Sequence, residues 1–94
     1  MIKLQLYGLL RIMLSGKAAI DLPWAEGETV GRVLLKFQSV ELIPVNHKLI
    51  DEHGALHTGT IILVNRKNIL HINGLDTPVQ DNDVLSLFPP GAGG

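Results

Sequence analysis

The chain ends in the stretch Val84-Leu85-Ser86-Leu87-Phe88-Pro89-Pro90-Gly91-Ala92-Gly93-Gly94. Residues 84–88 have the pattern of a β-strand that is apolar on both faces, because Leu85 and Leu87 point to one side and the other three residues to the opposite side. A strand of this kind usually lies inside a sheet or is covered on both sides. We therefore predict a central strand, from which the residues that follow leave the domain at a fixed position.

Two strands and a helix are predicted in the first half of the chain. Residues 2–7 alternate between apolar and polar side chains and residues 18–22 do so again, so the two segments are expected to pair antiparallel. Residues 8–17 contain turn-forming residues, which predicts the loop of a hairpin. Residues 29–39 are expected to form a helix capped by Thr29, because apolar residues recur there at spacings of three and four.

The second half of the chain predicts an irregular segment followed by short strands. Residues 40–59 are rich in turn-forming residues, so we expect a packed irregular segment with at most one short strand. Residues 60–65 are the most apolar strand, which predicts a central position or cover on both faces. A short strand is expected at residues 69–72, after a reversal of the chain.

This order of elements predicts the fold class. Segregated strands around one helix indicate an α+β fold, and a hairpin, a helix and further strands are the layout of a β-grasp, or ubiquitin-like, domain. Such a domain is a mixed sheet packed against one main helix, with the first and last strands side by side in the middle of the sheet. The length of 94 residues fits one domain, which we assign to residues 1–90, with residues 91–94 as a flexible tail.

The composition argues against several kinds of site and partner. The absence of cysteine excludes disulfides, thiolate metal sites and a cysteine nucleophile. A net charge of −1 argues against nucleic acid and anionic membranes as partners, and no apolar run approaches the length of a membrane span. The histidines follow no metal-ligand pattern and no catalytic constellation is found, so we expect neither a metal site nor an enzyme. We expect a cytoplasmic protein.

The tail after the last strand has the features of a functional element. No charged side chain follows Asp83, Pro89-Pro90 extend the backbone away from the domain, and glycines keep it narrow. We therefore predict that the α-carboxylate of Gly94 is the reactive group. The thin segment that carries it consists of Gly91, Ala92 and Gly93. The alternative is a glycine-rich terminus without a function, since chain ends commonly fray.

Residues 73–94, with Phe88-Pro89-Pro90 ending a strand shortly before Gly93-Gly94, resemble the C-terminal third of the MoaD family. This family comprises the small subunit of molybdopterin synthase and related ubiquitin-like sulfur carriers of the MoaD/ThiS superfamily. The resemblance covers most of the chain. It extends to the first hairpin through Tyr7-Gly8, Leu10-Arg11 and Gly16.

The resemblance implies a sulfur carrier cycle. An adenylating enzyme of the type that activates ubiquitin would use ATP to convert the Gly94 carboxylate to an acyl-adenylate. A sulfur donor would then replace the adenylate and leave a terminal thiocarboxylate. In the molybdopterin branch, the tail would enter the large subunit of molybdopterin synthase, which holds the catalytic pocket, and supply sulfur for the molybdenum or tungsten cofactor. The chain itself is expected to bind no cofactor.

A carrier has to bind at least two partners in turn, so we expect an exposed apolar patch beside the tail. The residues predicted to dock a partner are Leu85, Leu87, Phe88, Pro89 and Pro90. The alternative is that the last strand lies in the core, with the helix on one face and irregular packing on the other.

Departures from the family pattern leave the client pathway open. Family members commonly carry an apolar residue where this chain has Gly91, so one anchoring contact is missing. Many have Asn-Gly where it has Asn65-Arg66, which disfavours the tight turn expected there. Alternative functions within the class are sulfur carriage for thiamine synthesis, tRNA thiolation or amino-acid synthesis, and ubiquitin-like protein modification. An alternative from another class is a β-grasp binding module without tail chemistry.

Overall fold

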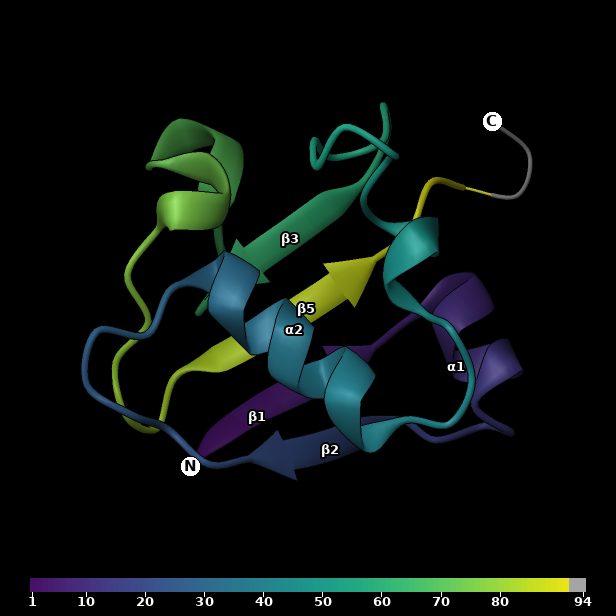
Figure 1. Ribbon diagram of the computed structural model, residues 1–94, viewed down its shortest axis with the longest axis horizontal. Helices are drawn as coiled ribbons and strands as arrows, with labels where there is room; N and C mark the ends of the chain where they lie inside the picture. The colour runs from purple at the N-terminus through teal and green to yellow at the C-terminus, as the bar shows by residue number, and fades with distance from the viewer. Residues whose placement is uncertain (92–94) are drawn as a thin grey trace.

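The last strand, β5 (Val84–Phe88), lies in the middle of a five-stranded mixed sheet in the computed structural model, which describes residues 1–91. The strand order is β2-β1-β5-β3-β4. β1 (Ile2–Leu6) runs parallel to β5 on one side, and β3 (Ile61–Val64) runs antiparallel to it on the other (Figure 1). The predictions of a central last strand and of a first strand beside it are confirmed.

The two outer strands complete the sheet. β2 (Ala19–Leu22) pairs antiparallel with β1, as predicted, and β4 (Lys67–Asn68) pairs antiparallel with β3. The prediction of a strand at residues 69–72 is wrong, because this segment begins with the 3₁₀ helix η2 (Ile69–His71). The Asn68 side chain accepts a hydrogen bond from the Leu70 N–H at 2.9 Å and so favours a helical turn over an extended strand.

The helix α2 (Val30–Val40) covers one face of the sheet (Figure 1). The Thr29 hydroxyl accepts a hydrogen bond from the Arg32 N–H at 3.3 Å, which is the predicted N-cap. The predicted apolar stripe is fully buried, and its residues are Val30, Val33, Leu34 and Phe37. The other face of the sheet points away from α2, and we call it the open face. Its central side chains are Gln5, Tyr7, Ile61, Leu63, Val84, Ser86 and Phe88.

The connection between β1 and β2 contains a helix where a loop was predicted. α1 (Gly8–Met13) follows Tyr7 and buries Leu10, and Leu14 at its C-cap is buried as well. A spacing of four places both leucines on the side of the helix that faces the core. The glycine at the start of the helix and the strand-like alternation before it concealed this short helical pattern.

Residues 40–59 form the packed irregular segment that was predicted. They contain the 3₁₀ helix η1 (Asn46–Lys48) and one isolated bridge between Ile50 and Leu56. Val45 and Leu49 are fully buried and attach the segment to the core. A further 3₁₀ helix, η3 (Gly74–Asp76), lies in the connection that leads to β5.

β3 lies inside the sheet between β5 and β4, which confirms the predicted central position, but only one of its faces is covered. Ile62 and Val64 are buried, whereas Ile61 is 43% exposed on the open face. Between β3 and β4 the chain turns through Asn65 and Arg66, whose φ angles of 54° and 92° are both positive. The tight turn therefore forms although arginine stands where such turns prefer glycine, and a left-handed non-glycine residue costs about 1–3 kcal/mol.

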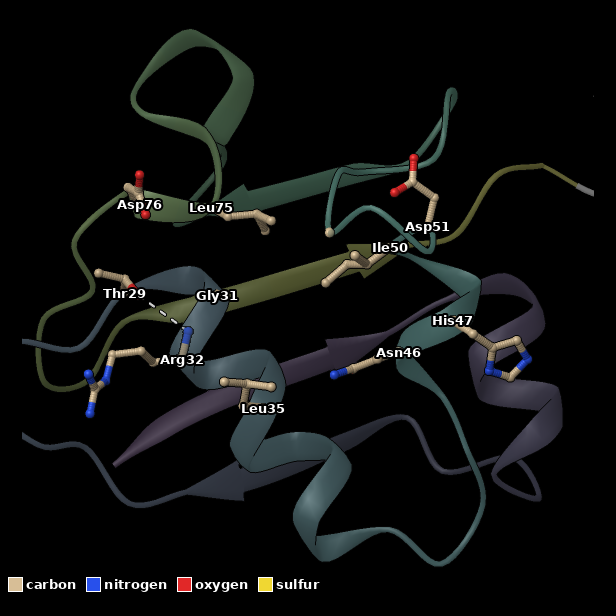
Figure 2. Close-up of a pocket in the computed structure, with 11 residues that line it drawn as sticks. Thr29, Gly31, Arg32, Leu35, Asn46, His47, Ile50, Asp51, Leu75 and Asp76 are labelled. Carbon is tan, nitrogen blue, oxygen red and sulfur yellow. Dashed lines mark hydrogen bonds between the residues drawn. The ribbon is translucent and has the colours of Figure 1, made fainter.

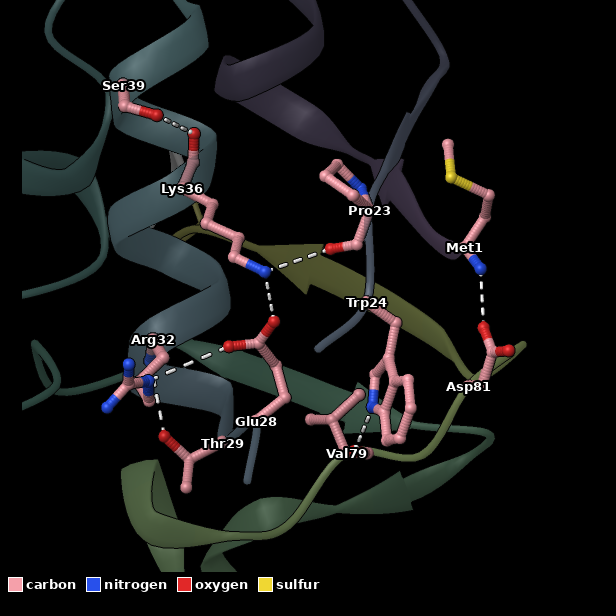
Figure 3. A network of polar contacts seen from close by, with 10 residues as sticks. All are labelled: Met1, Pro23, Trp24, Glu28, Thr29, Arg32, Lys36, Ser39, Val79 and Asp81. Carbon is pink, nitrogen blue, oxygen red and sulfur yellow. Dashed lines mark hydrogen bonds and ion pairs between the residues drawn. The ribbon is translucent and has the colours of Figure 1, made fainter. Parts of the chain in front are cut away.

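A buried carboxylate joins the loop before α2 to the helix (Figure 3). Glu28 forms an ion pair with Lys36, and the Arg32 Nε lies 3.7 Å from its other carboxylate oxygen. The Lys36 ammonium also donates to the carbonyl of Pro23 at 3.0 Å. Buried charges are tolerated when they are paired and hydrogen-bonded in this way, so this cluster fixes the path of the chain into α2.

Candidate functional site

The tail leaves the fold at Pro89 and Pro90, directly after β5, and we call these two residues the tail base. Pro89 is buried, Pro90 is half-buried and Gly91 is exposed. A Cβ atom on Gly8 would lie 3.8 Å from Cγ of Pro89, and one on Gly59 would lie 3.6 Å from Cβ of Pro90. The tail base is therefore packed between the start of α1 and the end of the irregular segment, which fixes the exit point of the tail.

The predicted reactive residue lies beyond this exit point. Gly94, together with the tail residues Ala92 and Gly93, lies outside the described residues, so the roles assigned to them stay predictions. Gly91 is the last described residue, and its exposure leaves it accessible to a partner.

Two cavities of different character flank the tail base. The first has a volume of about 560 Å³ and contains one charged side chain, that of Lys48, so we call it the cationic cavity; its other lining residues are Leu9, His47, His57, Thr58 and the two prolines. The second has a volume of about 200 Å³ and is mainly apolar; it is lined by Gly8, Leu9, Ile12, Gly91 and the same prolines. Both cavities include Leu9 and the two prolines, so a partner that receives the tail would meet both surfaces beside the tail base.

The two faces of β5 have different environments. Leu85 and Leu87 are fully buried, so the prediction that they dock a partner is corrected: the core beneath α2 already covers them. Phe88 points to the open face, where its ring stacks on that of Tyr7, with 4.2 Å between the ring centroids and 10° between the planes. Phe88 is only half-buried and is accessible for docking, whereas Pro89 is largely enclosed.

The stacked pair is extended by residues that the sequence analysis did not include in the site. The Arg11 guanidinium carbon lies 5.4 Å from the centroid of the Tyr7 ring, and the Arg11 Nε donates to the Leu6 carbonyl at 3.0 Å. The Tyr7 hydroxyl donates to the Gln5 Oε1 at 3.2 Å. The alternation of residues 2–7 already places Tyr7 on the same side as Gln5, and this was the signal that could have found it.

A third cavity, of about 570 Å³, lies beside α2 on the helix side of the sheet (Figure 2). Leu35, Ile50 and Leu75 give it an apolar lining, and charged groups such as Arg32 and Asp51 surround them. No residue of the tail base lines this cavity. It shares His47 with the cationic cavity but does not reach the tail base itself.

The described part of the chain contains neither a cluster of metal ligands nor a helix that could span a membrane. Among residues 1–91, no three His, Asp or Glu side chains gather as metal ligands. The His57 Nε2 lies 2.8 Å from the carbonyl oxygen of His47, so this imidazole nitrogen is engaged by the backbone. None of the helices in this range is long and apolar enough to cross a membrane.

Asp51 organises the turn that follows η1 through hydrogen bonds to its carboxylate. The titration of Asp51 tests whether these hydrogen bonds form in solution. Hydrogen bonds from the N–H groups of Ala55 and His53, at 3.0 and 2.8 Å, hold the pKa of Asp51 below its ordinary value of 3.8. Because the pKa of Asp51 is lower in the folded state than in the unfolded state, the ionised carboxylate stabilises the fold at pH values above the unfolded-state pKa. This stabilisation is lost as the pH falls through the folded-state pKa. In an NMR acid titration, we expect the Asp51 carboxyl to titrate below 3.8, with the two amide signals following it. Asp51→Ala should abolish their common transition, and a midpoint at or above 3.8 would contradict this account.

The chain matches known proteins in sequence and in structure. Residues 16–94 match the ThiS family. The chain is 35% identical over 66 residues to small archaeal modifier protein 3 of Haloferax volcanii, with 70% of each protein covered. It resembles a chain of the BexX/CysO complex of Amycolatopsis orientalis with a TM-score of 0.82 and 26% identity, covering 100% of both chains. Small archaeal modifier protein 1 of Methanosarcina acetivorans gives a TM-score of 0.74 and 32% identity over 99% of this chain and 95% of that one. The predicted β-grasp, ubiquitin-like fold is confirmed.

Proposed function

The chain belongs to the ThiS family of small ubiquitin-like carrier proteins, and on that premise we propose that it carries sulfur at its C-terminus. In this proposal a partner enzyme uses ATP to adenylate the α-carboxylate of Gly94, which is then converted to a thiocarboxylate. The observation that carries the proposal is the fixed tail base, because Pro89 is buried at the end of a central strand, between an apolar and a cationic cavity. A tail base fixed in this way suits presentation of the tail to a partner.

Adenylation overcomes the low reactivity of a carboxylate. In the proposed first step, a Gly94 carboxylate oxygen attacks the α-phosphate of ATP, and pyrophosphate leaves. The resulting acyl-adenylate is an activated acyl donor, so a sulfur donor at the oxidation level of sulfide can attack the acyl carbon. The new C–S bond replaces the C–O bond to AMP, AMP leaves, and the thiocarboxylate remains. The small side chains of the tail suit entry into a closed pocket of the partner, where water is excluded.

We propose that the open face around Tyr7 and Phe88 docks the adenylating enzyme. The stacked pair lies beside the tail base and is accessible, and aromatic side chains are frequent anchors in protein interfaces. The similarity to a chain found in a BexX/CysO complex supports a mode of action in which the carrier and its partner associate.

For the client pathway, we propose molybdopterin synthesis, in which the large subunit of molybdopterin synthase receives the tail and provides the catalytic pocket. The resemblance of residues 73–94 to the small subunit of that enzyme supports this choice. A second candidate is ubiquitin-like protein modification, which is supported by the 35% identity to a small archaeal modifier protein. Sulfur carriage for thiamine synthesis or tRNA thiolation would use the same terminus, whereas a pure binding module would not.

Intact-mass analysis tests the proposal directly. After incubation with the cognate adenylating enzyme, ATP and a sulfur source, we expect the mass increase that replacement of one carboxylate oxygen by sulfur produces. Omission of ATP is the control and should leave the mass unchanged. A chain whose mass stays unchanged in the complete reaction would exclude the carrier function. Covalent attachment to other proteins in place of a free thiocarboxylate would favour the modifier function.

A further inference from the structure

A fourth cavity, of about 380 Å³, lies on the open face at the opposite end of β5 from the tail. It is formed by β1, β5 and the turn between β3 and β4, and its lining residues are Gln5, Asn65, Arg66, Val84 and Ser86. Gln5 and Ser86 also lie between this cavity and the Tyr7–Phe88 stack, since they alternate with those residues along β1 and β5. The cavity is therefore continuous with the proposed docking surface.

Two side chains of this cavity, Gln5 and Arg66, offer hydrogen-bond donors that no other side chain within residues 1–91 accepts from. The Gln5 Oε1 already accepts from the Tyr7 hydroxyl at 3.2 Å and from the Ser86 hydroxyl at 3.3 Å, which leaves the Gln5 amide N–H groups. Asn65 is engaged on both sides, because it donates to Asp83 at 2.7 Å and accepts from the Val84 N–H at 2.9 Å. Within residues 1–91, neither the Gln5 Nε2 nor the Arg66 guanidinium has a side-chain partner.

Arg66 occupies its position against the preference of the backbone. Its φ of 92° lies in the left-handed region, which glycine adopts without strain and arginine does not. Arg66 is also the one charged residue that lines this cavity, and it is exposed. Backbone strain of this kind is typically retained where the side chain serves a function. The strained backbone and the exposed charge together indicate that the Arg66 side chain binds a hydrogen-bond acceptor on a partner.

We propose that Gln5 and Arg66 bind a carboxylate of an acidic side chain on the adenylating enzyme, at the end of the open face remote from the tail. The inference rests on the proposed function and deepens it. A guanidinium binds a carboxylate through two parallel hydrogen bonds, and the Gln5 amide supplies a further donor. A cavity lined by one cation suits a side-chain carboxylate, which the rest of the interface holds in place, better than a free multivalent phosphate, which needs several cations. The carboxylate then fixes the orientation of the carrier while the tail is inserted.

The substitution Arg66→Gly separates recognition from stability. It should weaken binding to the purified adenylating enzyme about tenfold, as loss of a charge-assisted hydrogen bond does, and should reduce the salt dependence of binding. The melting temperature should be unchanged or higher, because the strained residue is relieved. Lys67→Gln is the matched control: this neighbouring cation is exposed but does not line the cavity, so binding should change less than twofold.

Three results would overturn the inference. Arg66→Gly with wild-type affinity, or Lys67→Gln with an equal loss, would show that Arg66 has no specific role. Saturable NMR shifts of the Gln5 amide with inorganic phosphate alone would indicate a free-anion site in place of a docking surface. A wild-type chain that the enzyme binds but does not adenylate would remove the proposed function while leaving the Arg66 contact measurable, so the two failures are distinguishable.

Discussion

Deleting Gly94, or adding one residue after it, is expected to abolish adenylation while the melting temperature stays unchanged. One residue moves the reacting carboxylate by about 3.5 Å along the tail, and a misplacement of about 1 Å can already lower a rate about 100-fold. Neither change alters the tail base, whose packing against Gly8 and Gly59 fixes the exit point of the tail. Adenylation is measured as pyrophosphate release with the cognate enzyme, and stability by thermal unfolding.

Ala92→Gly is the matched control for this prediction, because it alters the same tail without changing its length. It should retain most of the wild-type rate of pyrophosphate release. Adenylation of the shortened chain at the wild-type rate would contradict the role assigned to the carboxylate of Gly94. Loss of stability in the shortened chain would instead show that the terminus belongs to the fold.

The central features of the fold could be predicted because they follow from the spacing of apolar residues. The alternation in β1 and β5, and the spacing of three and four in α2, each correspond to one buried face. α1 could not be predicted in this way, because six residues are too few to establish a helical period and Leu10 and Leu14 alone reveal its buried side. The segment after β4 forms a 3₁₀ helix in place of the predicted strand, because the Asn68 side chain caps that helix. Hydrophobic spacing gives no information about such a side-chain hydrogen bond.

Only part of the candidate site could be predicted, because the spacing of apolar residues does not identify the exposed face of β5. Alternation divides β5 into two sides, but it does not say which side α2 covers, because both carry apolar residues. The polar Ser86 was the one indication that its side, which includes Phe88, is the open face. Arg66 could not be assigned from the sequence, since its significance depends on a positive φ angle and on a cavity formed by two strands and a turn that are far apart in the sequence.

The two faces of β5 are expected to respond in opposite ways to substitution, and neighbouring residues provide the comparison. Leu87 is fully buried between Leu6 on β1 and Ile62 on β3. Leu87→Ala should therefore lower the free energy of unfolding by about 2–5 kcal/mol, a large part of the roughly 5–15 kcal/mol that stabilises a typical domain. Denaturation in urea measures this loss, and adenylation of the fraction that remains folded should stay near the wild-type rate.

Phe88→Asp should leave the domain folded but weaken binding of the adenylating enzyme. The stacked contact with Tyr7 contributes about 0.5–1.5 kcal/mol beyond its buried area, so the domain should remain folded in urea at concentrations that unfold Leu87→Ala. A carboxylate beside the Tyr7 ring, within the proposed docking surface, would be desolvated on docking, which should weaken binding of the adenylating enzyme by at least about tenfold. A different outcome would assign Phe88 to the core: Phe88→Asp unfolds, while Leu87→Ala and the conservative variant Phe88→Leu still bind the adenylating enzyme tightly. The docking surface would then have to lie elsewhere, on α1 or around the cationic cavity beside the tail base.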